Sequence, residues 1–427
     1  MAAILVSGGI YSGSGDLTCD AVVLGGKQAG GAEDWGDSTF ICPDGVLTLA
    51  GNSDIGYTDA AIFVYHTNDT WTHNGGTLRF TGAGLQNVTN YYNAAMTFNN
   101  VEIQNSNSSL TEGVRWGSPW NFDTDMSRLT ISGTANFECY NRTTSHFTVT
   151  GTVHIPSGNF ARHATPIDSG EHNRFGSLII GADGTYTAAS SGGEILSITS
   201  KTSEGSWDHF AFDNSAGGTF VHNSGTVSLD LQTSYQNIKM GSQWLYNFRS
   251  TNTEPSYDVG AQVAAQNFNV ANDVIIVSGA SFDSSSYTTI VSGTVWCSGN
   301  WGQFSTQKNR KTLGSLKIGG IGKFKAPNDT GDLPGLTINK IDGDSYKFRV
   351  EDNATFEHNN GTVALDVSTD GGFYKNTGSN GKWLYNLIVK NDTTDARVSQ
   401  HIGDVSVSNT LIVSGAGSAA ADWDAGF

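Results

Sequence analysis

Three histidines occur in one recurring pattern, and histidine is the side chain best suited to bind metal or move protons near neutral pH. The pattern is aromatic, any residue, His, Asn, any residue, Gly, Thr, aliphatic, and it reads WTHNGGTL, FVHNSGTV and FEHNNGTV. Its histidines, His73, His222 and His358, lie far apart in the chain, one in each copy. Ligands of one metal ion lie within a few ångströms of each other, which residues on separate repeats cannot do.

We therefore interpret the pattern as a structural corner. Polar side chains before a glycine often bond nearby backbone groups, and Asn and Gly accept the positive φ of a tight turn. In the third copy we expect the turn at residues 359–361, with Val363 and Leu365 facing the core. The expected corner residues are His73, Asn74, Gly76, His222, Asn223, Gly225, His358, Asn359 and Gly361.

Paired carboxylates are the second candidate for a catalytic site, because glycosidases hold two carboxylates about 5–9.5 Å apart. Local pairs occur at Asp123/Asp125 and Asp342/Asp344, and the second, in DGDS, is typical of a turn. The sequence contains no glycine-rich calcium nonapeptide, GxSxG, Walker loop, HExxH or GxGxxG in a βαβ context. We predict a protein that is not an enzyme, with no catalytic residue, metal or cofactor.

Aromatic residues are further candidates for structural or contact roles. Trp244 and Trp383 recur in WLYNF and WLYNL and are expected to be structural. Four aromatics outside the repeated strings could be contact residues for sugars or proteins, or core residues: Tyr91, Tyr92, Trp116 and Trp120.

The four cysteines include no CxxC pair, which argues against a zinc site. Cys19 and Cys42, about one coil apart in the sequence, could be stacked neighbours. Cys139 and Cys297 are expected to be small buried residues.

Composition indicates the elements that carry these residues. The 427-residue chain has 53 Gly, 7 Pro and 15 % charged residues, a mixture that favours strands joined by tight turns over long helices. Its net charge of −17 argues against binding nucleic acid. A basic segment from Lys308 to Lys325 is a solvated turn region or a contact for an acidic partner. The apolar N-terminal stretch is too short for a secretory signal, and no run reaches membrane-spanning length.

Several further strings recur in the same order, which predicts about three tandem units of roughly 140 residues. Besides WLYNF, they are FGSLIIG (175–181) with LGSLKIG (313–319), VTGTVHIPSGNF (149–160) with VSGTVWCSGNW (291–301), and LTISG (129–133) with IIVSG (275–279) and LIVSG (411–415). The expected units are 1–127, 128–272 and 273–408, followed by a partial repeat with a cap or docking tail at 409–427.

Within each unit, short strands and turns recur at intervals of about two dozen positions, which is typical of one turn of a β-solenoid. A propeller blade would need about 40–50 residues, and serial sandwiches would need about seven strands per 100 residues. We predict an all-β, parallel β-helix of about 18 short coils, with roughly 23 residues each. Sandwiches and a propeller are the alternatives.

The strings FEHNNGTVALD, WLYNLIVKND, LTISG and GSLIIG, in tandem, resemble β-solenoid structural proteins of marine tailed bacteriophages, which include fibres, spikes and capsid appendages. The resemblance implies a non-enzymatic virion component, assembled in the host cytoplasm, that docks on other virion proteins. It also implies a homo-oligomer, with a trimer favoured, and a host-surface glycan as a further partner. A tailspike depolymerase and a bacterial surface adhesin are the alternatives.

Overall fold

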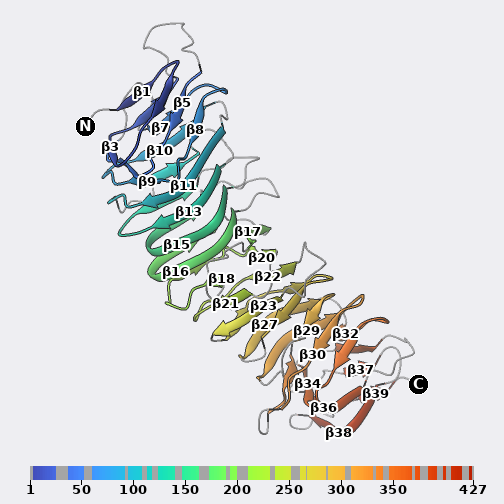
Figure 1. Ribbon diagram of the computed structural model, residues 1–427. Coiled ribbons are helices and arrows are strands. Elements are labelled where there is room, and N and C mark those ends of the chain that lie inside the picture. Colours follow the sequence, from blue (N-terminus) through green and yellow to red (C-terminus); the bar gives the residue numbers. More distant parts are fainter. Residues whose placement is uncertain are drawn as a thin grey trace. The chain divides into compact units, whose positions relative to one another are not determined.

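The computed structural model consists of strands, with 39 strands and no helix among the residues it describes (Figure 1). The described residues are 3–25, 37–51, 60–91, 95–107, 113–117, 124–139, 147–162, 173–188, 193–199, 210–230, 236–251, 260–265, 267–284, 287–302, 309–329, 333–339, 346–367, 371–375, 383–391, 398–400, 405–415 and 423–425. The paired strands run parallel, as the β-solenoid prediction requires, so that fold class is confirmed.

The chain divides into two compact units, residues 1–204 with 212–225 and residues 205–211 with 226–427. Each unit contains three ladders of stacked parallel strands, and the chain visits one ladder after another as it coils. The two units do not coincide with the three expected tandem units, which remain a prediction from the sequence.

The first unit contains ladders A, B and C. Ladder A consists of β1 (Ile4–Val6), β4 (Val22–Leu24), β7 (Ala60–Val64), β10 (Gln86–Asn90), β12 (Val114–Trp116), β14 (Asn136–Cys139), the last parts of β15 (Phe147–Arg162) and β16 (Asn173–Thr187), and β19 (Thr219–Val221). Ladder B consists of β2 (Ile10–Ser12), β5 (Thr39–Ile41), β8 (Thr70–Thr72), the first parts of β11 (Ala95–Ile103), β13 (Thr124–Ile131), β15 and β16, and β17 (Glu194–Ile198). Ladder C consists of β3 (Leu17–Cys19), β6 (Val46–Leu49), β9 (Thr77–Phe80), the last parts of β11 and β13, the middle of β15 and β16, and the last two residues of β18 (Phe210–Asp213).

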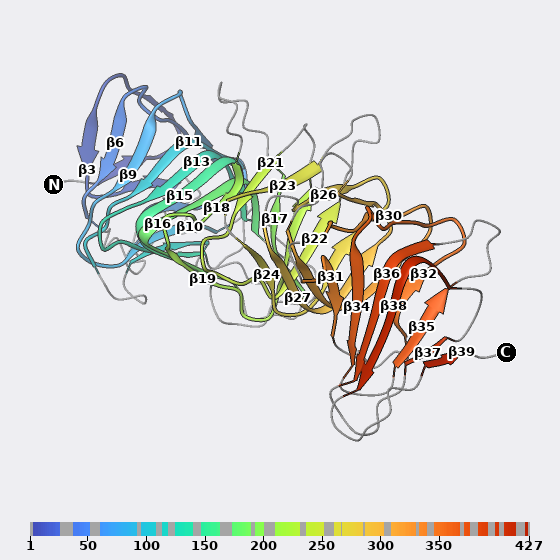
Figure 2. The same ribbon diagram turned by 90° about the horizontal axis from the view of Figure 1, so that it is seen from below.

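The second unit contains ladders D, E and F. Ladder D consists of β20 (Thr226–Asp230), β22 (Asn247–Thr251), β25 (Val274–Ile276), the last parts of β27 (Thr289–Cys297) and β29 (Lys311–Ile318), β32 (Tyr346–Val350), β35 (Gly371–Lys375), β37 (Val398–Gln400) and β39 (Trp423–Ala425). Ladder E consists of β24 (Phe268–Val270), the first parts of β27 and β29, β31 (Leu336–Ile338), β34 (Thr362–Val367), β36 (Trp383–Asn391) and β38 (Ser406–Gly415) (Figure 2). Ladder F consists of β21 (Gln236–Lys239), β23 (Gly260–Ala265), β26 (Ser281–Asp283), β28 (Asn300–Trp301), β30 (Lys323–Lys325) and β33 (Thr355–Glu357).

Coil length varies from step to step. Val295 pairs with Leu316 in the second unit, whereas Val22 pairs with Ile62 in the first. The coil that begins at Val22 is therefore almost twice as long as the coil that begins at Val295. The coils are thus less regular than the evenly spaced strings of the sequence predict, and the expected number of about 18 coils is not confirmed.

Inward-facing side chains form the core of each unit as continuous columns. In the first unit, Tyr11, Phe40 and Trp71 stack with ring centroids 4.9 and 4.6 Å apart. In the second unit, Val363 and Leu365 are buried in ladder E, as expected from the third corner pattern. Period-two alternation places every second side chain of a strand inward, and parallel stacking then sets like residues above one another.

Candidate functional site

The three histidines of the recurring pattern lie at turns that follow a strand. The Nδ1 atoms of His73, His222 and His358 each accept a hydrogen bond from the backbone N–H two residues further on, at 3.3, 3.0 and 2.9 Å. The ring of His358 also stacks on Tyr385, with centroids 5.7 Å apart. Burial lowers the pKa of His222. One ring nitrogen of each histidine is thus used to hold its own turn, which is the arrangement expected for a structural corner.

Left-handed backbone explains why Asn and Gly occupy these turns. Asn223 and Ser224 have φ of 45° and 60°, and Asn359 and Asn360 have φ of 47° and 56°. In the first copy Gly75 takes the positive value, at 78°. Asn tolerates this region better than most residues, and Gly does so without steric cost.

The glycine that ends each turn lies against the preceding coil. A Cβ atom placed on Gly76 or Gly361 would lie 2.2 Å from the carbonyl oxygen of Pro43 or Pro327, respectively. On Gly225 it would meet a side chain at the same distance. The first and third copies therefore share one environment, in which only a residue without a side chain fits.

Hydroxyl side chains of two further repeated strings lie within hydrogen-bond distance of each other across adjacent coils, in both units. The hydroxyls of Thr152 and Ser177 are 2.9 Å apart in the first unit, and those of Thr294 and Ser315 are 2.8 Å apart in the second. Each pair joins a Gly-Thr string to the Gly-Ser string of the next coil. The sequence shows that these strings recur in order, but only the strand register shows that they touch.

Asparagines of the WLYN strings take part in a further bond between coils. Asn272 Nδ2 donates to Asn247 Oδ1 at 2.9 Å, and Asn409 Nδ2 donates to Asn386 Oδ1 at 2.8 Å. The neighbouring Trp244, expected to be structural, is 38 % exposed. The side chain of Trp383 lies outside the described part of the structure.

The four candidate contact aromatics differ in their burial and in whether the structure describes them. Trp116 is 1 % exposed, and its ring centroid lies 5.0 Å from that of Phe98. A contact role for Trp116 is therefore wrong, because its inward position in ladder A makes it a core residue. Tyr91 is partly buried and stacks on Tyr65 at 5.5 Å. Two candidates lie outside the described residues: Tyr92 and Trp120.

The structure does not describe the side chains of the carboxylate candidates. Three lie outside the described residues, namely Asp123, Asp342 and Asp344, and Asp125 is described only by its backbone in β13. Across the described ranges, no three His, Cys, Asp or Glu residues are grouped as a metal ion would require.

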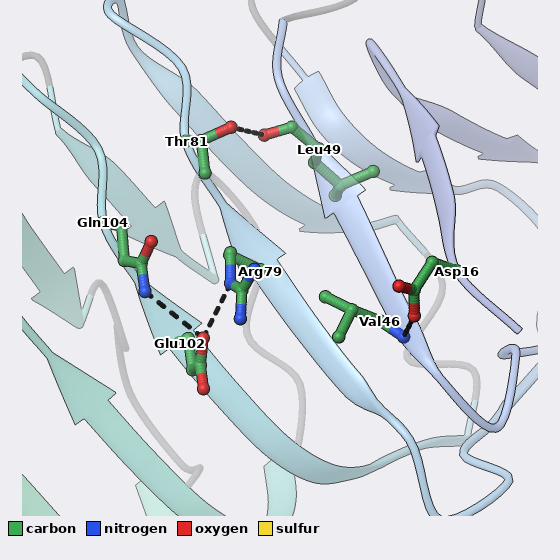
Figure 3. Close-up of polar contacts among 7 residues, drawn as sticks. All are labelled: Asp16, Val46, Leu49, Arg79, Thr81, Glu102 and Gln104. Atoms are coloured by element: carbon green, nitrogen blue, oxygen red, sulfur yellow. Dashed lines mark hydrogen bonds and ion pairs between the residues drawn. The ribbon is translucent and has the colours of Figure 1, made fainter.

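Outward-facing carboxylates in the first unit pair with cations on neighbouring coils. Arg79 Nε lies 2.7 Å from Glu102 Oε2, which also accepts a bond from Gln104 at 3.3 Å (Figure 3). Asp16 instead accepts the backbone N–H of Val46 at 2.9 Å (Figure 3). Partly exposed pairs of this kind contribute about 0–1 kcal/mol each, so they align coils more than they stabilise them.

The basic segment is not a solvated turn region, because it contains β29 and β30. Lys311 is fully buried and donates to the carbonyl oxygens of Ser284 and Tyr287 at 2.7 and 3.1 Å. Burial lowers the pKa of Lys311 to about 7, and the carboxylate of Asp283 opposes that change. Lys323 pairs with an acidic side chain at 2.6 Å. Lys308 lies outside the described residues.

Buried Lys311 escaped sequence reasoning because its strand looks amphipathic. In ladder E it lies in an inward column between Thr289 and Leu336. A second lysine, Lys347, is also buried, and burial lowers its pKa to about 8 against the opposing charge of Asp366. The one local signal for an inward Lys311 is buried Leu313, two positions further on, because alternate side chains of a strand share a face.

All four cysteines are buried, and none of them is in a disulfide bond. Cys19 pairs in register with Leu49 in ladder C, whereas Cys42 follows β5 of ladder B. The expectation that Cys19 and Cys42 stack is therefore wrong, because they occupy different ladders. Burial raises the pKa of the Cys19 thiol to about 11, and those of Cys42 and Cys297 to about 12.

The described part of the chain has no helix that is long and apolar enough to span a membrane. Comparison of the chain with protein-family models, with curated proteins and with solved structures gave no match.

Proposed function

We propose that the protein is a non-enzymatic structural component of a virus particle, a spike, fibre or capsid decoration that docks on other virion proteins. The resemblance of its tandem strings to bacteriophage β-solenoid proteins supports a location in a virus particle. The structure supports a structural role.

The observation that carries this proposal is the use made of the repeated residues. In both units, recurring His, Asn, Ser and Thr side chains bond their own turns or the adjacent coil. The recurring polar groups thus hold turns and coils together, as expected of a protein with a structural role.

Immunogold labelling of purified particles tests the location. We expect antibodies against this protein to label intact particles at regular positions, and mass spectrometry of the same particles to detect its peptides. Labelling of bacterial surfaces with none on particles would instead support an adhesin.

The non-enzymatic part needs its own assay. The purified protein is incubated with capsule or lipopolysaccharide from the host, and released reducing ends are measured over hours. We expect no release above a heat-denatured control. Steady release of oligosaccharides would contradict this proposal and support a depolymerase.

A further inference from the structure

Ladder D of the second unit has a column of side chains at outward register positions that combines cations with apolar residues, in a chain that is acidic overall. The column, here called the outer column, runs through five successive coils in register: Arg249, Ile275, Trp296, Lys317 and Arg349. Successive members lie about 4.8 Å apart along the stack, the spacing of neighbouring strands. Three cations therefore flank two apolar side chains on one strip, in a chain of net charge −17.

The apolar centre of the outer column is open to solvent. Trp296 is 42 % exposed and Ile275 is 39 % exposed, whereas their neighbours along each strand point inward and are buried. Exposed Trp beside an exposed aliphatic residue forms a flat apolar platform, a type of surface that accepts a ring.

One face of the indole is already occupied. The Nζ atom of Lys317 lies 4.1 Å from the centroid of the Trp296 ring, and Lys317 is 4 % exposed. The solvent-exposed area of Trp296 therefore lies away from Lys317. The ammonium offsets the negative charge of the ring, so the exposed part of the indole suits an anionic ring better than a cationic one.

The strands beneath the outer column offer no free edge. From β22 through β25, β27 and β29 to β32, each strand is hydrogen-bonded to the next in ladder D, and β22 and β32 pair further with β20 and β35. An acidic peptide could not add itself as a strand there, which is a main mode of peptide capture on sheets. Recognition must use side chains alone.

The arginines at the two ends of the outer column indicate which ligand charge the column would bind. Arg249 is exposed, and Arg349 lies two coils beyond Trp296, where it pairs with Glu351 at 3.1 Å. Guanidinium groups bind carboxylates in bidentate geometry. A ligand lying along the column would thus meet a ring platform with a guanidinium about two coil spacings, roughly 10 Å, to either side.

We propose that the outer column binds an anionic polysaccharide, with a sugar ring of a uronate chain on Trp296 and Ile275 and its carboxylates directed to Arg249 and Arg349. This inference goes beyond the proposed structural role, which requires no ligand on this face of the second unit. It names the class of ligand and the residues that bind it.

Isothermal titration with polygalacturonate as the probe, at about 50 mM salt, tests the proposal on the full chain. We expect the wild type to bind polygalacturonate and not neutral dextran. Its affinity for polygalacturonate should fall as added salt screens the charges. Trp296→Ala should weaken binding at least about tenfold, and Arg249→Gln about threefold to tenfold. Thermal melting of each variant shows that it remains folded.

Matched controls use residues of the same unit that lie off the outer column. Trp244→Ala removes an indole of similar exposure, and Lys325→Gln removes a cation of ladder F; both should bind as the wild type does. Absence of binding by the wild type, or equal losses in Trp296→Ala and Trp244→Ala, would overturn the proposal. Equal or tighter binding of polyglutamate would overturn it in favour of an acidic peptide. None of these outcomes bears on whether antibodies label virus particles.

Discussion

At the scale of single residues, the corner pattern combines two demands that a local sequence can meet. In the second and third copies the turn contains two residues with positive φ, and the histidine before them supplies an acceptor for a backbone N–H. The glycine after them needs no special φ in the third copy but must leave room for a carbonyl oxygen. The glycine is therefore the less replaceable member of the pattern.

Replacing Gly361 by valine should lower the free energy of unfolding by about 2–3 kcal/mol, a cost typical of overpacking at its upper end. The reason is the 2.2 Å approach of a Cβ atom to the carbonyl oxygen of Pro327. Denaturant unfolding measures the change. Gly9→Val is the matched control, because a Cβ atom at Gly9 meets nothing within 4 Å. Equal costs in the two variants would contradict this account.

Replacing His358 by alanine should cost only about 0.5–1.5 kcal/mol, the net contribution of one hydrogen bond. The same unfolding experiment applies, and no binding or enzymatic activity should be lost. His358→Asn should recover most of the loss, since an Asn side chain can also accept a bond from the backbone two residues on. A large loss in both variants would point to a role for the imidazole that the turn does not explain.

At the scale of strands, stability arises from columns in which each coil covers the next. Hydroxyl pairs and asparagine pairs fix the register between coils, and aromatic rings fill the space between ladders. A buried ring in such a column touches residues of both adjacent coils. Its removal should therefore disturb more than its own strand.

Replacing Trp116 by alanine should lower the free energy of unfolding by about 3–5 kcal/mol, the cost of deleting a large buried aromatic. Trp116 packs in ladder A against Phe98 and Phe137, with centroids 5.0 and 6.1 Å away. Trp244→Ala removes the same side chain from a partly exposed position and should cost about 1 kcal/mol or less. Chemical denaturation of both variants compares them directly, and similar costs would show that Trp116 is not a core residue.

At the scale of the whole molecule, buried lysines give stability an unusual pH dependence. The pKa of Lys311 falls to about 7 in the folded chain, against about 10.4 in the unfolded chain. Between these values the unfolded chain binds a proton that the folded chain does not, so stability rises with pH. A neutral amine still donates to the two carbonyl oxygens it contacts.

The Lys311→Met variant should lose this dependence. Raising the pH from 7 to 10 should increase the stability of the wild type relative to the variant by more than about 1 kcal/mol, because each unit of pKa difference corresponds to about 1.4 kcal/mol. Buried thiols act in the opposite direction in both proteins, so the difference between them is the quantity to measure. Thermal melting at four pH values, with Lys325→Met as a control, is sufficient. A pH-independent difference would show that Lys311 is charged in the folded chain.

The sequence alone determined the all-β solenoid and its corners, because turn residues and period-two alternation act over a few neighbouring positions. Thus the turn at Asn359 and the inward direction of Val363 follow from one short string. Only the tertiary structure decided which side chains meet across coils, because the spacing between paired residues changes from one coil to the next, even within ladder A. That variable register buried Lys311 and Trp116 in the core, and it aligned Trp296 with the cations of the outer column.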